Sequence, residues 1–220
     1  GDLFPVQQEI ALGVLRALQM KLAPADESRL GNRGTRDAEA YRLYTMGLTL
    51  LRGRAVARDN NRAGELFGAA LARDPQFAAA QAGVALVHFF DAWTAHASTE
   101  RRIRDGRTAA ERAVALDPES SEALLARANF EALQSRYRGD ADGYVRSQRD
   151  YRRALELDPT NSAIYFNFGR SVFWDDSDLA LNLLQNSVDL DPLWDSALAL
   201  SALLTSARGL HDAARDRLRE

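Results

Sequence analysis

The stretch that decides the fold reads RALELDP at residues 153–159. Close versions of it recur as AALARDP at 69–75, RAVALDP at 112–118 and NSVDLDP at 186–192. Each version is a run of helix-forming residues that ends in Asp-Pro, and a helix normally stops at or before the residue that precedes a proline. We therefore predict that each phrase closes one helix and opens a turn into the next.

The four Asp-Pro pairs are spaced like the units of a repeat. Their aspartates lie 43, 41 and 33 residues apart along the chain. Between them the small and apolar residues recur in steps of three and four, as in Leu43, Met46, Gly47 and Leu50, which is the period of one helix face. β-branched residues are few and no run alternates cleanly, so strands are not expected. The pattern predicts two helices in each of five units, preceded by one leading helix.

A pair of helices closed by proline, with a period near the ~34 residues of that family, resembles the tetratricopeptide repeat (TPR). The family places small or aromatic residues where two helices approach closely, and unit one matches with Gly47, Ala63, Phe67, Ala70 and Pro75. The resemblance implies an all-α fold, a right-handed α-solenoid of about five TPR helix pairs. Residues 1–36 would form the leading helix and linker, and residues 37–220 the array. The expected units are 37–76, 77–119, 120–160, 161–193 and 194–220.

Units one to three are longer than the family pattern between their two helices. The extra residues fall around 53–59, 95–104 and 137–143. Either the helices are longer than usual there or their connecting loops bulge. Unit five stops inside its expected second helix without a closing proline, so we expect the chain to be a piece of a longer protein or to lack its natural cap.

Residues 1–22 carry a second resemblance. The run DLFPVQQEIALGVLRAL at 2–18 resembles a segment of bacterial regulators that joins a TolB-like domain to a TPR array, often behind a winged-helix, cyclase or protein-kinase module. The resemblance implies an interaction or scaffold domain of a larger bacterial regulatory protein in the cytoplasm, or alternatively the periplasmic part of a membrane-anchored regulator. The segment itself is expected to pack on unit one as a cap, with an independent partner-binding helix as the alternative.

The TPR resemblance also implies a binding surface. In that family the first helix of each unit lines a concave groove, and the corresponding residues here would be largely apolar and aromatic, with Asn129 and Arg170 as polar handles. We expect them to bind another protein or peptide through apolar anchors. The predicted contact residues are Tyr41, Tyr44, Leu48, Phe89, Glu122, Asn129, Phe166, Arg170, Phe173 and Trp174.

Some of these positions have a second interpretation. Several apolar residues, Phe90 and Leu133 above all, would serve equally well as packing between helices. The two-carboxylate clamp of chaperone-binding TPR proteins is not expected, because Tyr44, Ala82 and Phe166 stand where the clamp needs basic residues.

Composition excludes several classes of function. The net charge is −3, whereas a nucleic-acid-binding domain is expected to present a strongly basic face. Because the chain has no cysteine, disulfides and zinc-thiolate sites are excluded. No apolar run approaches the roughly 20 residues that cross a bilayer, so no membrane span is expected in this segment.

Catalytic and metal-binding motifs are not found. The three histidines, His88, His96 and His211, are too far apart to hold one metal without other ligands. Residues 140–143 (DADG) lack the later glycine and glutamate of a calcium loop, so we predict a polar turn. Phosphate-binding glycine motifs and nucleophile elbows do not occur. We expect no enzyme, no cofactor and no metal.

Two further hypotheses concern binding. His88, Phe89, Trp93 and His96 cluster in sequence beside the longest insertion and would form one wall of a pocket for a small molecule or peptide signal, relayed to an attached effector such as a transcription regulator or nucleotide cyclase. The other hypothesis is a homo-oligomer, formed if the leading helix or the uncapped last unit packs on another copy.

Overall fold

All regular structure in the described part of the chain is α-helical. The computed structural model describes residues 34–52, 57–94 and 99–217. The predicted all-α class is confirmed, while the leading helix expected near residues 2–22 lies outside the described residues. The helices are α3 (Ala38–Arg52), α4 (Ala57–Arg73), α5 (Ala78–Thr94), α6 (Thr99–Leu116), α7 (Ser121–Arg138), α8 (Ala141–Leu157), α9 (Ser162–Val172), α10 (Ser177–Leu190) and α11 (Asp195–Arg217).

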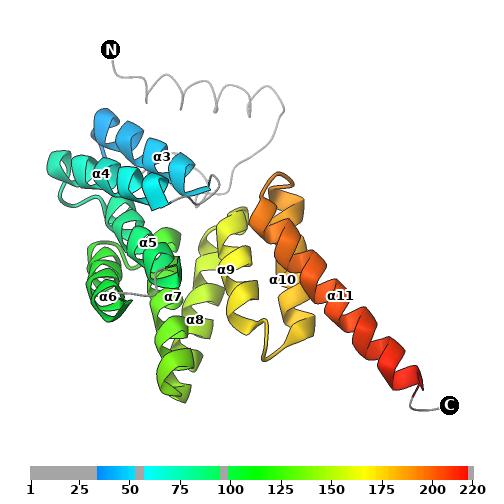
Figure 1. The fold of residues 1–220 in the computed structure, drawn as a ribbon. Coiled ribbons are helices and arrows are strands. Elements are labelled where there is room, and N and C mark those ends of the chain that lie inside the picture. Colours follow the sequence, from blue (N-terminus) through cyan, green and yellow to red (C-terminus); the bar gives the residue numbers. More distant parts are fainter. Residues whose placement is uncertain (1–33, 53–56, 95–98, 218–220) are drawn as a thin grey trace.

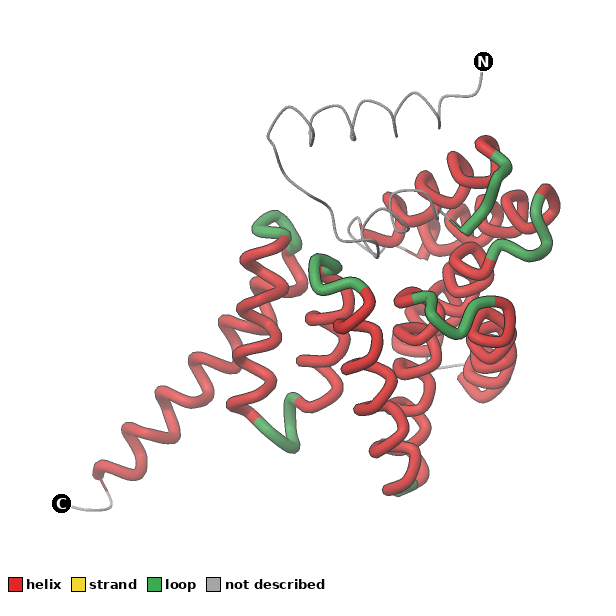
Figure 2. The backbone as a smooth tube through the Cα atoms, turned by 180° about the vertical axis from the view of Figure 1, so that it is seen from behind, coloured by secondary structure: helices red, strands yellow, loops and turns green. Residues whose placement is uncertain are grey.

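The helices stack as successive pairs. Within the described residues α3 packs on α4, α5 on α6, α7 on α8 and α9 on α10, and each pair contacts the next (Figure 1). Figure 2 shows the same pairs from behind, joined by short loops. Helix α11 lies along α10 and then projects beyond the stack. No helix of the described segments has both the length and the apolar character needed to cross a membrane.

The Asp-Pro phrases end helices as predicted, and each of the four turns uses the same backbone hydrogen bonds. The aspartate N–H makes the last helical bond, as from Asp158 to the Ala154 carbonyl at 2.9 Å. The aspartate carbonyl then accepts from the residue three positions on, which bridges the proline. In three of the turns the carboxylate also accepts from the backbone N–H two residues on, at Asp74, Asp117 and Asp158. Aspartate therefore stabilises the chain reversal locally.

Where the extra residues of the first three units are described, most of them lie in helices, with 57–59 in α4, 99–104 in α6 and 141–143 in α8. Helices α3 to α8 have 15 to 18 residues each, whereas α9 has 11 and α10 has 14. Between α7 and α8 only two residues are outside a helix. Gly139 ends α7 with φ of 67°, and Asp140 caps α8 by accepting from the Gly143 N–H at 3.0 Å. The polar turn predicted at 140–143 is thus a helix cap.

The fifth unit differs from the expected helix pair. Helix α11 runs without a break over 23 residues, from Asp195 to Arg217. Nothing in that stretch forces a stop, since a glycine inside a helix costs only ~1 kcal/mol relative to alanine, and Gly209 is accommodated within α11. The prediction of a second helix in this unit was therefore wrong.

Glycines let the first two helix pairs approach closely around Phe67. This side chain is fully buried between α3 and α5. A Cβ atom added at Gly47 would lie 2.7 Å from the Phe67 ring, and one added at Gly83 would lie 2.6 Å from it. Both distances are shorter than van der Waals contact, so the two backbones sit where only glycine fits.

Candidate functional site

A pocket of about 530 Å³ lies where the first helices of four successive units converge. Its walls come from α5, α7, α9 and α11, with one residue from α8 and two that directly follow α9. The lining residues are Phe89, Asn129, Ala132, Leu133, Arg136, Tyr151, Phe166, Arg170, Ser171, Phe173, Trp174, Ser196, Ala199, Leu200 and Leu203.

Arg170 stands in this pocket against two aromatic rings. Its guanidinium carbon is 4.7 Å from the ring centroid of Phe89 on α5 and 5.9 Å from that of Phe166 on its own helix. Its Nη2 donates to the Asn167 Oδ1 at 2.9 Å. Burial lowers the pKa of Arg170, and the charge of Arg136 lowers it further. An arginine nevertheless stays protonated in proteins, so the pocket holds a fixed positive charge.

The inner wall of the pocket holds a buried amide. Tyr151 is fully buried, and its hydroxyl donates to Oδ1 of Asn129 at 2.8 Å. Its ring stacks on Phe168 with centroids 5.0 Å apart. Asn129 is 1% exposed, and its Nδ2 has no hydrogen-bond partner. Because Tyr151 occupies the amide oxygen, the amide nitrogen is left as a donor without an acceptor.

Burial of Tyr151 keeps its hydroxyl in the donating form. The fully buried environment raises the pKa of Tyr151 well above its usual value. The phenol therefore remains protonated across the physiological range and continues to donate to Asn129.

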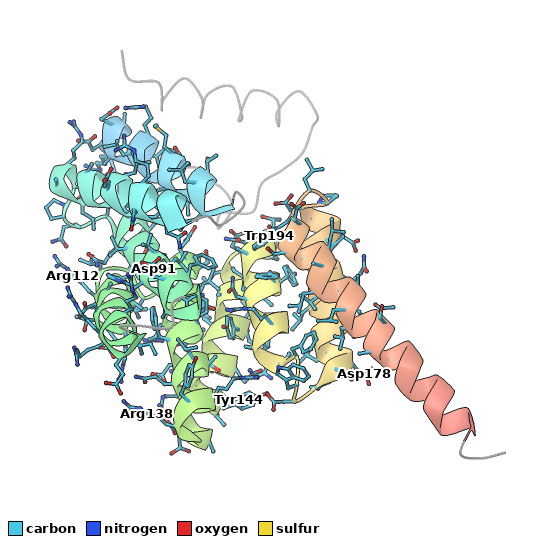
Figure 3. The ribbon with its side chains drawn as sticks, in the orientation of Figure 1. Asp91, Arg112, Arg138, Tyr144, Asp178 and Trp194 are labelled. Atoms are coloured by element: carbon cyan, nitrogen blue, oxygen red, sulfur yellow. The ribbon has the colours of Figure 1, made fainter. Side chains whose placement is uncertain are left out.

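The rim of the pocket is apolar and exposed, with one charged side chain. Trp174 is 76% exposed and Leu203 is 58% exposed. Arg136 Nη2 lies 3.5 Å from the Ser171 carbonyl, which it donates to, and 3.9 Å from Oδ2 of Asp175. Trp194, labelled in Figure 3, braces the pocket from the turn before α11, with its ring centroid 4.6 Å from that of Phe166.

Six of the ten contact residues predicted from the sequence line this pocket, namely Phe89, Asn129, Phe166, Arg170, Phe173 and Trp174. The remaining four lie elsewhere. Tyr44 is 6% exposed and packs edge-on against Phe77, with ring centroids 5.0 Å apart. Tyr41 and Leu48 are half-buried against the same core cluster. Glu122 is in the first turn of α7, where it accepts from the hydroxyls of Ser120 and Ser121.

Leu133 and Phe90, which suit either the groove or the helix packing by sequence, have different places in the structure. Leu133 lines the pocket and is 5% exposed, while Phe90 is half-buried against a core cluster. Of the two residues of the predicted pocket wall whose side chains are described, Phe89 lines the concave pocket and His88 does not. The side chains of Trp93 and His96 are not among those described. In the described segments no group of three or more His, Cys, Asp and Glu side chains is placed to hold a metal ion.

Sequence reasoning missed four of the residues that line the pocket, namely Arg136, Tyr151, Ser171 and Leu200. Arg136 lies in the extra turns of α7, beyond the length that the repeat pattern assigns to a first helix. Tyr151 matches an aromatic position that packs between helices, and in the structure it also lines the pocket. On α11, Ser196, Ala199 and Leu203 stand at groove positions that the TPR resemblance implies, whereas Leu200 does not.

Comparison with known proteins identifies the architecture. No family model matches the sequence, and no curated protein matches it either. Among solved structures, a thermophilic TPR protein of Thermus thermophilus aligns with a TM-score of 0.56 and 20% identity, covering 91% of this chain and 97% of its own. The fold is a TPR-type α-solenoid. The HusA haemophore of Porphyromonas gingivalis also aligns, with a TM-score of 0.59 and 18% identity, covering 80% of this chain and 96% of its own.

Proposed function

We propose that this chain is a non-catalytic interaction domain that holds a partner protein or peptide in the concave pocket of its solenoid. The observation that supports this most directly is the exposed apolar rim, formed by Trp174 and Leu203, around a buried aromatic floor. Aromatic and arginine side chains at the centre of an interface commonly supply most of the binding energy. The floor offers Phe89, Phe166 and Arg170 in that role.

The floor is held in place by the fold before any partner arrives. Phe89 is 1% exposed and meets the ring of Phe130 edge-on, with centroids 5.7 Å apart. Phe166 is 8% exposed and is braced by Trp194. A surface that is rigid before binding loses less conformational entropy on binding, which favours affinity. The solenoid can therefore bind a partner in this pocket without changing its own shape.

The wider setting that we propose is a larger bacterial regulatory or signalling protein in the cytoplasm, with a periplasmic setting as the alternative. The segment at 2–18, which resembles the junction between TolB-like and TPR parts, supports this setting. In that arrangement the solenoid would recruit the partner and an attached module would carry the output.

A matched pair of variants tests the proposal. Leu203→Asp places a charge on the pocket rim, and Leu193→Asp places the same charge on a leucine that is 89% exposed and outside the pocket. Both proteins and the wild type serve as bait in lysate of the source organism, after circular dichroism confirms that they are folded. We expect a protein captured by the wild type and by Leu193→Asp, and lost with Leu203→Asp. Equal capture by all three proteins would place the binding surface elsewhere.

A second candidate function is the sensing of a small ligand. A pocket of about 530 Å³ falls in the range of small-molecule sites, and one of the similar solved structures is a haemophore. Thermal-shift measurements with a metabolite library and with haemin test this candidate. A rise in melting temperature with the wild type that is absent with Leu203→Asp would favour the small ligand over the protein partner.

A further inference from the structure

The charged side chains that line the concave pocket are all positive. Among its described lining residues there are two arginines, Arg136 and Arg170, and no aspartate or glutamate. Asp175 lies outside the lining set, 3.9 Å from the Arg136 guanidinium. A partner group that enters the pocket therefore meets a net positive charge within an apolar wall, where electrostatic interactions are less screened than at an open surface.

The hydrogen-bonding groups of the pocket have the same polarity. The Asn129 amide nitrogen is buried, has no hydrogen-bond partner and is a donor. Arginine side chains are also donors only. Buried polar groups are nearly always satisfied in folded proteins, so an orphaned donor in a pocket wall points to an acceptor that arrives from outside. These donors are complementary to a negatively charged group with several acceptor oxygens. Among the side chains of proteins, the carboxylates of Asp and Glu supply both the acceptor oxygens and the negative charge.

The apolar surface around the donors shows what accompanies that carboxylate. Phe173 packs against Trp174 with ring centroids 4.9 Å apart, and Leu203 faces the same pocket from α11. Trp174 and Leu203 remain largely exposed on the rim. A small acid seated on the pocket floor would leave this rim uncovered, whereas a polypeptide covers floor and rim together.

We infer that the pocket recognises an acidic side chain next to a large apolar side chain on a partner polypeptide. The carboxylate accepts from Arg170, Arg136 and the Asn129 amide nitrogen, and the apolar side chain covers Trp174 and Leu203. This inference rests on the proposed interaction function and specifies the chemistry of the partner. It also explains why Arg170, held over the Phe89 ring, is built into an otherwise apolar floor.

The test is a selection from a random 12-residue peptide library displayed with its carboxyl end fused to a coat protein, so that every free carboxylate comes from a side chain. The wild-type chain is the bait. The enriched sequences are then made as fluorescent, carboxyl-amidated peptides and titrated by fluorescence anisotropy. We expect Asp or Glu within one or two positions of Phe, Trp, Leu or Met in the binding peptides. Binding should weaken as salt rises, because the Arg136 side chain at the rim is 45% exposed and its charge is screened by salt.

Variants locate the carboxylate in the pocket. We expect Arg170→Met to weaken binding by about tenfold or more, because removal of one partner of a buried charge pair is costly. Changing the peptide acid to its amide should weaken wild-type binding similarly and change Arg170→Met binding by less than about twofold, since the two changes remove one interaction. Arg136→Gln should weaken binding to a smaller degree. Arg138→Gln, on the same helix but outside the pocket and placed at its lower end in Figure 3, should leave binding unchanged.

Three results would overturn the inference. The first is enrichment of peptides that contain no Asp or Glu and that bind the wild type but not the Leu203→Asp variant. This result would support the proposed interaction function and refute an acidic partner. Phenylacetate that displaces the peptide at a comparable concentration would make a small organic acid the occupant. Enrichment of no peptide, or of peptides that bind Leu203→Asp equally well, would contradict both the inference and the proposed function. If Arg170→Met does not fold, the Arg136→Gln and Arg138→Gln pair carries the same comparison.

Discussion

The guanidinium of Arg170 on α9 lies over the ring of Phe89 on α5, with 4.7 Å between the guanidinium carbon and the ring centroid. The two helices are the first helices of units two units apart, so this contact spans the solenoid across α7. It ties the second unit to the fourth and places a charge at the centre of the concave face.

This contact should contribute to stability as well as to binding. Phe89→Leu and Arg170→Met each remove the cation–π pair, and the double variant removes it only once. We expect a coupling of about 1 kcal/mol in the free energy of unfolding, as for partly desolvated pairs. Urea denaturation of the wild type, both single variants and the double variant measures it. Additive effects, within about 0.3–0.5 kcal/mol, would mean that the two side chains do not stabilise each other.

Close packing around Phe67 predicts opposite effects for two glycines. A Cβ at Gly47 collides with the Phe67 ring, and so Gly47→Ala should destabilise the chain by about 1–3 kcal/mol, as overpacked cores do. Gly68 lies in α4 with open space around its Cβ position, so Gly68→Ala should stabilise by about 0.5–1 kcal/mol. Thermal denaturation of the two variants compares them directly. The same sign of effect for both would contradict the packing described here.

A buried ion pair between α7 and α8 gives a third prediction. Arg127 contacts both carboxylate oxygens of Asp150, at 2.6 and 2.9 Å, and Asp150 is 3% exposed. Arg127→Met leaves that carboxylate buried without its main partner, and should cost about 3–5 kcal/mol. Arg153→Gln removes a more exposed pair with Glu119 and should change the melting temperature little. An equal loss of stability in Arg127→Met and Arg153→Gln would refute the claim that burial makes the Arg127–Asp150 pair the more important of the two.

His88 predicts a loss of stability in mild acid. The side chain is half-buried and its Nδ1 has no hydrogen-bond partner. Burial is the main cause that lowers the pKa of His88. The negative charges of Asp105 and Asp91 raise this pKa in part, and the positive charges of Arg102 and Arg101 lower it. The unfolded chain therefore binds a proton that the folded chain does not, and stability should decrease as pH falls below about 6.5.

Replacing the histidine isolates that contribution. Urea denaturation at a series of pH values should give a shallower decrease between about pH 6.5 and pH 5 for His88→Gln than for the wild type. Identical slopes would show that His88 has the same pKa in the folded and unfolded chain. Carboxylates such as Asp37 and Asp140, whose pKa values the fold lowers, lose their contribution only in more acidic solution.

Local signals in the sequence were sufficient for the helix pairs. Asp-Pro both stops a helix and supplies the side-chain acceptor of the turn, so Asp74, Asp117 and Asp158 mark helix ends without reference to the rest of the fold. The same reasoning failed for α11, because no residue between 195 and 217 imposes a stop. The sequence also left open whether the extra residues of units one to three lengthen the helices or form bulging loops. Helical periodicity in the sequence is compatible with either arrangement, so the structure was needed to decide.

The concave site depends on contacts between units, and the sequence predicts these less well. Tyr44 and Phe166 occupy equivalent positions in units one and four, yet Tyr44 packs into a core with Phe77 while Phe166 lines the pocket. The difference comes from the neighbouring helices and not from the repeat position.

The most direct test of the central claim is site-specific photocrosslinking in cells of the source organism. A benzoylphenylalanine placed at Leu203 faces the concave pocket, and one placed at Leu193 is exposed outside it. We predict a covalent adduct with one partner polypeptide at position 203, abolished by Arg170→Met, and none at position 193. An adduct at position 193 with none at position 203 would contradict a partner-binding concave pocket.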